Sequence, residues 1–349
     1  MNSIENQNNA NLAQCTSESD VICVIVTYAD RKSLLLTVLE GLLDQGVRRV
    51  IVVDNGSDWP VKDELSLHHG EFVDVVEMSR NTGSAGGYSA GIQRAMDLGA
   101  KYIWLLDDDN LPGTGCLEAL LSAYNHLRKK HSTDHLAVLA FRPEHQVEVA
   151  AGMPLHRINT RRNSFLGFHI CDIPYKFWRR TPWGRPRVQE KLSALFDVAV
   201  APYSGLLLPR TAVNAIGLPR KDFVLYADDH EYTSRITHAG GRIVLVTNAY
   251  LEDLEKSWNV RKNAGNSFGV LLSQGSEFRV YYSTRNATYL STYCRSHDNW
   301  MLWLNRRIYL GMLDIIAVLS GQNKRYRLIK EAVDDGLAGS LGFHPRFPL

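Results

Sequence analysis

Three consecutive aspartates, Asp107 to Asp109, follow the apolar run Tyr102–Leu106. Adjacent carboxylates repel one another, and each raises the pKa of its neighbours. One interpretation of the triplet is a solvated turn that caps a helix. At the end of a buried strand, however, a divalent cation would turn the repulsion into attraction, and carboxylate oxygens suit Mg²⁺ or Mn²⁺. Because Mg²⁺ is commonly held by one or two carboxylates together with substrate phosphates, the triplet predicts a metal site that binds a diphosphate.

A glycine-rich segment, GSAGGYSAG from Gly83 to Gly91, precedes the triplet. It matches neither the dinucleotide-binding pattern GxGxxG nor the P-loop pattern. Its glycines would let a helix pack closely on a strand, or let a nucleotide approach the backbone N–H groups at a helix start. The segment by itself leaves both interpretations open.

Asp54 lies in the segment VVDNGS, at the end of another apolar run. An Asp-Asn-Gly sequence is typical of a turn. The carboxylate could instead accept a hydrogen bond from the N–H of a pyrimidine base. The position of Asp54 at a strand end favours the second interpretation.

Strand and helix patterns alternate from Val21 to about His126. The runs VICVIVTY, RRVIVVDNGS, VDVVEMS and KYIWLL have the composition of buried strands, and amphipathic or glycine-rich helix patterns separate them. This alternation predicts an α/β fold, with a mostly parallel sheet and helices on both faces. In such sheets ligands bind beyond the carboxyl ends of the strands. The predicted ends carry Thr27 and Tyr28, Asp54, Asn81 and the aspartate triplet, which we expect to line one crevice.

The bulk properties exclude some classes of protein. A net charge of +2 over 349 residues gives no general attraction to nucleic acid, so no nucleic-acid partner is expected. Five cysteines without a CxxC pair favour a reducing cytoplasm over a disulfide framework. The Asn-rich residues 1–20 lack the features of a signal peptide and predict a disordered tail. The apolar run Trp300–Gly321, interrupted by Arg306, Arg307 and Asp314, suits either a core helix or a helix at the inner-membrane surface.

Four segments resemble, in order and spacing, the large family 2 of inverting, nucleotide-sugar-dependent glycosyltransferases. They are VIVTYADRKSLLLTVLEGLLDQG, VIVVDNGS, RNTGSAGGYSAGIQRAMDLGAKYIWLLDDDNLP and YADDHEYTSRITHAGG. The glycine segment followed by IWLLDDDNLP is similar to the galactofuranosyltransferase branch, to which rhamnosyltransferases of bacterial surface polysaccharides are related. The resemblance implies a GT-A fold, which is Rossmann-like, followed here by a C-terminal helical region.

The resemblance also implies roles on the donor side of the site. Mn²⁺ or Mg²⁺ would be bound, with the diphosphate, by the outer members of a DxD motif, Asp107 and Asp109. The nucleoside would be held by Thr27, Tyr28 and Asp54. The nucleotide-sugar would run along Asn81, Gly86 and Gly87, and Asp108 is expected in the same substrate site.

On the acceptor side, the resemblance makes Asp229, in the segment ADDHE, the catalytic base. Helix capping is the alternative for Asp228 and Asp229, and one of the two could cap while the other catalyses. Glu231 would bind acceptor hydroxyls, and Asp228 and Trp258 are expected in the substrate site.

The sequence departs from the family pattern at one position. Relatives often place a metal-binding histidine after the strand that follows the base helix. Here that strand gives NAYLEDLEKSW, with Glu252 and Asp253 where the histidine is expected. Because oxygen ligands suit Mg²⁺ or Mn²⁺, Asp253 is the expected substitute.

We therefore expect residues 21–126 to bind the nucleotide-sugar, residues 127–256 to bind the acceptor through the base and a basic, aromatic insertion, and residues 257–349 to form a helical region. The expected function is metal-dependent transfer, with inversion, of galactofuranose from UDP-galactofuranose to a growing bacterial surface glycan of O-antigen, capsule or cell-wall type. The acceptor would be a glycan, free or linked to a lipid pyrophosphate. Oligomerisation and peripheral contact with the cytoplasmic face of the inner membrane are left open.

Three other functions stay open at this point. The donor could be dTDP-L-rhamnose. The chain could bind a nucleotide-sugar without catalysis, which the missing histidine favours. The aspartates could instead serve a nucleotidyltransferase or a phosphohydrolase.

Overall fold

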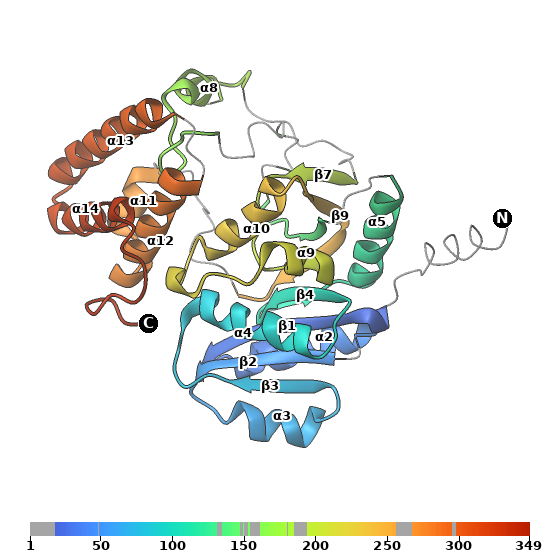
Figure 1. The fold of residues 1–349 in the computed structure, drawn as a ribbon. Coiled ribbons are helices and arrows are strands. Elements are labelled where there is room, and N and C mark those ends of the chain that lie inside the picture. The colour runs from blue at the N-terminus through green and yellow to red at the C-terminus, as the bar shows by residue number, and fades with distance from the viewer. Residues whose placement is uncertain are drawn as a thin grey trace.

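The structure, a computed structural model, describes residues 18–47, 49–130, 135–146, 149, 153, 161–179, 181–184, 194–255, 267–294 and 298–349 (Figure 1). Most of the expected N-terminal tail and Trp258 lie outside these residues. The strands are β1 Val21–Ala29, β2 Arg49–Ser57, β3 Val73–Glu77, β4 Tyr102–Asp107, β5 Asn110–Pro112, β6 Leu136–Phe141, β7 Leu195–Val198, β8 Leu206–Pro209 and β9 Arg242–Asp253. The α-helices are α2 Lys32–Asp44, α3 Val61–His69, α4 Gly83–Asp97, α5 Cys116–Lys130, α8 Ile173–Trp178, α9 Arg210–Ile216, α10 Asp228–His238, α11 Ser267–Ser273, α12 Glu277–Tyr289, α13 Asn299–Leu319 and α14 Asn323–Ala338. Short 3₁₀ turns, η1 Glu18–Asp20, η2 Ile170–Asp172 and η3 Lys221–Phe223, and a π-helical turn, η4 Leu290–Cys294, complete the set.

The strands form one sheet in the order β3-β2-β1-β4-β8-β6-β9-β5, with β7 paired to β9. The first four strands are parallel to one another, β6 is parallel to β9, and β8 joins the two groups by antiparallel pairing to β4 and β6. This arrangement confirms the expected α/β fold with helices on both faces.

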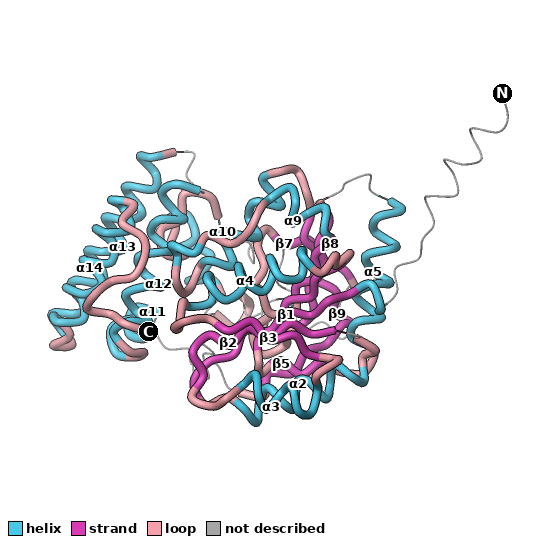
Figure 2. The backbone as a smooth tube through the Cα atoms, turned by 60° about the horizontal axis from the view of Figure 1, so that its bottom comes forward, coloured by secondary structure: helices cyan, strands magenta, loops and turns pink. Residues whose placement is uncertain are grey.

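Successive strand residues face opposite sides of the sheet, because the side-chain period of a strand is two. In β1, Ile25 packs with helices α2, α3 and α5, whereas its neighbour Val24 packs with α4, α9 and α10. Figure 2 shows α2 and α3 on one side of β1, β2 and β3 and α4 on the other. Burial on both faces explains why these strands are continuous apolar runs rather than alternating ones.

The strand register aligns the polar strand ends. Thr27 of β1 pairs with Asp54 of β2, and Val26 pairs with Asp107 of β4. Asp54 in turn pairs with Glu77, four residues before Asn81. The residues predicted at strand ends therefore lie along one edge of the sheet.

The C-terminal helices α11 to α14 pack together beside the sheet (Figure 1). Their core includes Val280, Leu313 and Val333, and it is shared with Phe165 and Val224 from the preceding part of the chain. Within the described residues, no helix is both long enough and apolar enough to span a bilayer.

Candidate active site

The aspartate triplet lies where strand β4 ends and the chain turns into the short strand β5. Strand β5 pairs antiparallel with the end of β9, which places Asn110 opposite Asp253. The backbone N–H of Leu254 donates to the carbonyl of Asp109 at 2.9 Å. Two acidic segments that are far apart in the sequence are therefore joined at one corner of the sheet.

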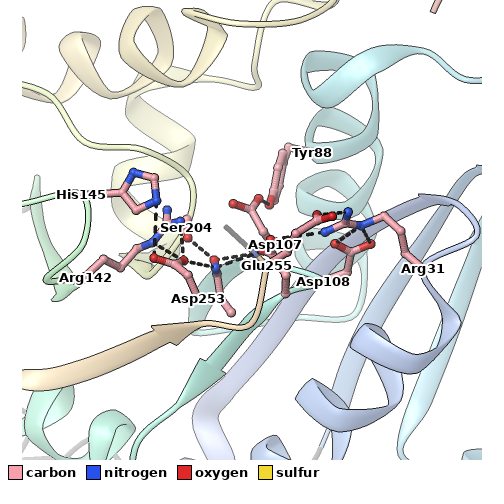
Figure 3. A network of polar contacts seen from close by, with 11 residues as sticks. Arg31, Tyr88, Asp107, Asp108, Arg142, His145, Ser204, Asp253 and Glu255 are labelled. Carbon is pink, nitrogen blue, oxygen red and sulfur yellow. Dashed lines mark hydrogen bonds and ion pairs between the residues drawn. The ribbon is translucent and has the colours of Figure 1, made fainter. Parts of the chain in front are cut away.

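Arginines partly balance the charge of this corner. Arg31, at the start of α2, donates from Nε to both oxygens of Asp108, at 2.8 and 2.9 Å, and its Nη2 lies 3.3 Å from Asp109. Its Nη1 also pairs with Glu255. Arg142 forms the corresponding pair with Asp253, with Nη2 2.5 Å from Oδ1. Five carboxylates thus face two guanidinium groups in the network that Figure 3 shows.

Burial, together with the excess of negative charge, raises the pKa values of two aspartates of the triplet. Burial raises the pKa of Asp109 to about 7, and the carboxylates of Asp107 and Asp108 act in the same direction. Burial also raises the pKa of Asp108, to about 6, although Arg31 lowers it. Both carboxyl groups hold their charge poorly in the absence of a further cation. Hard oxygen donors and surplus negative charge suit Mn²⁺ or Mg²⁺, so the residues present fit the metal that the sequence predicted.

The three aspartates have different surroundings. Asp107 accepts a hydrogen bond from the hydroxyl of Tyr88 at 2.6 Å, and Asp109 one from Asn110 at 3.2 Å. Asp108 is only 2% exposed and lies against Arg31. The geometry therefore leaves the outer aspartates as the accessible pair, and direct contact between Asp108 and substrate stays a prediction.

Asp253, the expected substitute for the histidine, has a carboxylate that is already engaged. Its Oδ1 accepts hydrogen bonds from Arg142 and Asn110, and its Oδ2 lies 3.4 Å from Nε2 of His145. Burial and then Arg142 lower the pKa of His145. Metal ligation by Asp253 stays a prediction. In the structure, Asp253 holds Asn110, which contacts both Asp107 and Asp109.

The glycine segment forms the first turns of α4. A Cβ atom on Gly87 would come 2.6 Å from Val26 of β1, and one on Gly86 would come 2.3 Å from Oγ1 of Thr82. These contacts show the packing role that the sequence had left open. Contact between the two glycines and a nucleotide stays a prediction.

The loop before α4 is fixed by Asn55, which follows Asp54 at the predicted strand end and was expected in the crevice without a role of its own. Asn55 is buried, its Oδ1 accepts from the backbone N–H of Thr82 at 2.9 Å, and its Nδ2 donates to Oδ1 of Asn81 at 3.2 Å. Asp54 accepts from the N–H of Ser57 at 2.9 Å, which is the turn that its sequence predicts. The half-exposed Tyr28 ring beside Asp54 stacks with Arg31 at 5.3 Å.

The predicted base lies in the first turn of α10. Asp228 is buried and accepts from Oγ of Ser84 at 2.8 Å, and burial followed by repulsion from Asp229 raises its pKa to about 8. Asp229 is partly exposed, and its Oδ1 accepts from the N–H of His230 at 2.7 Å. The positive end of the α10 dipole favours a carboxylate at this position. Burial and the neighbouring Asp229 favour the protonated form of Asp228, and Asp229 is the more exposed of the two side chains.

Glu231, expected to bind the acceptor, lies in the same first turn of α10 and is buried. Both of its oxygens accept hydrogen bonds from Arg235, at 3.0 and 2.5 Å. Arg235 also donates to the carbonyl of Ile216, so this pair anchors α10 to α9. Acceptor binding by Glu231 stays a prediction.

Two buried tyrosines connect the metal corner to the base helix. The rings of Tyr88 and Tyr203 are 4.2 Å apart, and Tyr88 bonds to Asp107. Burial and then the charge of Asp228 raise the pKa of Tyr203, which shows that Tyr203 lies near the base helix. The Tyr88–Tyr203 pair thus lies close to both the carboxylate corner and the start of α10.

A small cavity lies beside the first turn of α10. Its volume is about 190 Å³. Its polar lining residues are Arg161, Ser164, His230 and Ser291. Because Ala227 and His230 flank the two aspartates and also line the cavity, a group held there would lie close to the start of α10.

Comparisons with known proteins show similarity to glycosyltransferases. A profile of the family described as Glycosyl transferase family 2 matches residues 23–178. Among curated proteins, the galactofuranosyltransferase GlfT1 of Mycolicibacterium smegmatis is 28% identical over 230 residues, which cover 64% of this chain and 68% of GlfT1.

Among solved structures, a crystal structure of GalNAc-T7 with UDP, GalNAc and Mn²⁺ aligns with a TM-score of 0.50 and 13% identity, over 77% of this chain and 47% of that chain. This likeness shows a shared fold. A crystal structure of residues 1–349 of S. aureus TarS aligns with a TM-score of 0.44 and 10% identity, over 91% of each chain.

Proposed function

We propose that this chain, a glycosyltransferase with a family 2 domain, moves galactofuranose from UDP-galactofuranose to a hydroxyl of a growing bacterial surface glycan, with inversion at the sugar. The observation that carries the reaction type is the surplus of carboxylates at the aspartate triplet. The Tyr88–Tyr203 pair lies close both to this triplet and to the first turn of α10, where Asp229 is partly exposed. Similarity to GlfT1 supports the choice of sugar. UDP and Mn²⁺ in the GalNAc-T7 structure support the choice of nucleotide and metal.

In this proposal Asp107 and Asp109 hold Mn²⁺ or Mg²⁺, which as a Lewis acid would stabilise the negative charge on the departing diphosphate. Arg31 fixes the middle aspartate and keeps the turn closed. Thr27, Tyr28 and Asp54 receive the nucleoside at the ends of β1 and β2.

Asp229 acts on the acceptor. An acceptor hydroxyl attacks the anomeric carbon on the face opposite the diphosphate, and the bond from carbon to the diphosphate oxygen breaks. The hydroxyl proton becomes acidic as the new C–O bond forms, and the carboxylate of Asp229 accepts it. One displacement of this kind inverts the anomeric centre. The cavity lined by Arg161 and His230 is a place for a sugar of the acceptor glycan.

The proposed division of labour places donor binding in residues 21–126 and acceptor binding in residues 127–256. Residues 257–349 support both through the helical region.

A transfer assay with the purified chain tests the function. UDP-galactofuranose, dTDP-L-rhamnose and other UDP-sugars are offered with alkyl glycosides and lipid-pyrophosphate-linked oligosaccharides, and released nucleotide and product mass are measured. We expect UDP release from UDP-galactofuranose that requires both Mn²⁺ and an acceptor, and that chelation abolishes. Preference for dTDP-L-rhamnose would make the proposed sugar wrong. Nucleotide binding without turnover, or nucleotide hydrolysis without an acceptor, would contradict a glycosyltransferase of this kind.

We also propose that helix α13 contacts an anionic membrane surface, where a lipid-linked acceptor would lie. Its outer face exposes Trp300, Ile315, Val318 and Leu319, the last at 82%. The exposed basic residues Lys324 and Arg327 follow at the start of α14. Apolar side chains next to basic ones match the boundary between acyl chains and anionic headgroups.

Sedimentation with vesicles tests this contact. Replacing Ile315 and Leu319 by glutamate is expected to lower binding to phosphatidylglycerol vesicles by about tenfold or more, because several buried CH₂ groups are lost at about 0.8 kcal/mol each. The control is Leu67→Glu, at a side chain that is 78% exposed on α3. Equal binding of wild type, the double variant and the control to vesicles would rule out the membrane contact. A wild-type dimer that dissociates in the double variant, with vesicle binding unchanged, would also rule it out.

A further inference from the structure

The loop that leads into α10 has a strained backbone. Val224 has φ 66° and ψ −70°, and the N–H of Leu225 donates across it to the carbonyl of Phe223 at 2.8 Å. This is a γ-turn of the rare positive-φ kind. Tyr226 and Ala227 also have positive φ, of 67° and 60°. Non-glycine residues keep such conformations only where the surroundings enforce them.

Asn286 of helix α12 supplies that enforcement. Its side chain is fully buried, and its Nδ2 lies 2.7 Å from the carbonyl oxygen of Phe223, 2.8 Å from that of Leu225 and 2.9 Å from that of Tyr226. The two N–H groups of this amide are therefore shared among three carbonyls of the strained loop. The carbonyl of Phe223 has further donors in Leu225 and Arg285, so loss of Asn286 would be costly chiefly at the carbonyls of Leu225 and Tyr226.

Arg285 orients the amide. Its Nε donates to Oδ1 of Asn286 at 2.9 Å, which turns Nδ2 toward the loop. Its own Nη2 donates to the carbonyl of Phe223 at 3.3 Å, and its Nη1 donates to that of Gly342 at 2.6 Å. The Arg-Asn pair of the segment YYSTRNATYL thus connects α12 to the loop before α10, and Arg285 also contacts Gly342.

The same loop also contacts helix α4. The carbonyl of Val224 accepts from the N–H of Ala85 at 3.2 Å, and a Cβ on Gly83 would come 2.0 Å from that carbonyl. The loop then continues into Asp228, which bonds to Ser84. It therefore sets the position of the base helix relative to the first turn of α4.

We propose that Asn286, oriented by Arg285, is a positioning residue that holds Asp229 toward the acceptor hydroxyl through the loop from Val224 to Ala227. This inference rests on the proposed role of Asp229 as the base. It assigns the C-terminal helical region an indirect part in catalysis, in which none of its residues need touch the substrates.

The first test is Asn286→Ala, measured with UDP-galactofuranose and the acceptor that turns over fastest in the transfer assay. We expect kcat per UDP-binding site to fall about 10²-fold, since a misplacement of about 1 Å can have that effect. The donor KM and the stoichiometry of UDP and Mn²⁺ binding should stay at the wild-type values. The control Ser283→Ala removes a side-chain bond from the same helix to the carbonyl of Val280, and it should keep the wild-type kcat.

A double-mutant cycle separates positioning from general stabilisation. In an Asp229→Asn background, Asn286→Ala should add little, because both changes remove the same function. Losses that multiply would overturn the inference, as would a folded Asn286→Ala enzyme with wild-type kcat. If Asn286→Ala does not fold, Arg285→Lys replaces it in the cycle, because lysine lacks the Nε donor to Asn286. This variant should show a smaller loss of kcat, and the loss should again add little in the Asp229→Asn background. Losses of kcat that multiply in this second cycle would also overturn the inference. Wild-type activity of Asp229→Asn would instead refute the proposed base itself.

Discussion

Replacement of Asp229 by asparagine is expected to lower the rate of glycosyl transfer by about 10²- to 10⁴-fold, the usual contribution of a general base. Asparagine keeps the size of the side chain but cannot accept the proton of the acceptor hydroxyl. Steady-state kinetics with varied donor should show the loss in kcat, with the donor KM little changed, because Asp229 lies on α10 and not on the donor-binding strand ends.

The matched control for this change is the adjacent residue. Asp228 has a pKa of about 8 and is therefore mostly protonated at pH 7, so Asp228→Asn imitates its normal state. This variant should keep most of the activity. If Asp228→Asn is inactive and Asp229→Asn active, the two roles are exchanged. If both retain full activity, the chain uses no base at this position.

The second large effect is expected from the double replacement of Asp107 and Asp109 by asparagine. Loss of the metal ligands should lower Mn²⁺-dependent transfer by about 10²- to 10³-fold or more, since Lewis-acid stabilisation contributes several kcal/mol and each 1.36 kcal/mol is about tenfold in rate. Isothermal titration should show that UDP no longer binds more tightly when Mn²⁺ is added. Asp63→Asn, at an exposed position in the first turn of α3, is the control and should behave as wild type.

Replacement of Asp109 should raise the stability of the fold above neutral pH, although it lowers activity. The folded pKa of Asp109 is about 7, above the ordinary value of 3.8, so the folded state binds this proton more tightly than the unfolded state. The free energy of unfolding therefore falls as pH rises from about 4 to about 7. In the absence of metal, Asp109→Asn should raise the melting temperature at pH 8 and leave it unchanged near pH 4. A variant that loses both stability at pH 8 and activity would mean that Asp109 is an ordinary structural residue.

The fold was largely predictable because its signals are local. The run VICVIVTY became β1, Val21–Ala29, and the run KYIWLL became β4, Tyr102–Asp107. Both strands are buried on both faces, so their length and composition predict a strand without knowledge of its neighbours. The parallel register then brought the polar strand ends together.

The contacts of the predicted site residues could not be predicted in the same way, because their partners lie far away in the sequence. Arg31 and Asp108 are 77 positions apart, and Arg142 and Asp253 are 111 apart, so no spacing pattern indicates that these carboxylates are paired. Asn55 and Asn286 hold loops through backbone carbonyls and N–H groups, which leave no mark in the sequence of the loops. The pair of Glu231 with Arg235 is the exception, since opposite charges four residues apart on a helix predict it.

The central claim is that the outer aspartates of the triplet, with a divalent ion, bind the diphosphate of the donor. A crystal structure of the chain with Mn²⁺ and UDP tests it most directly. The account predicts an anomalous manganese peak between Asp107 and Asp109, bridged to the UDP phosphates, with Asp108 still bonded to Arg31. UDP bound elsewhere, or bound at this edge with no manganese at the two aspartates, would contradict it.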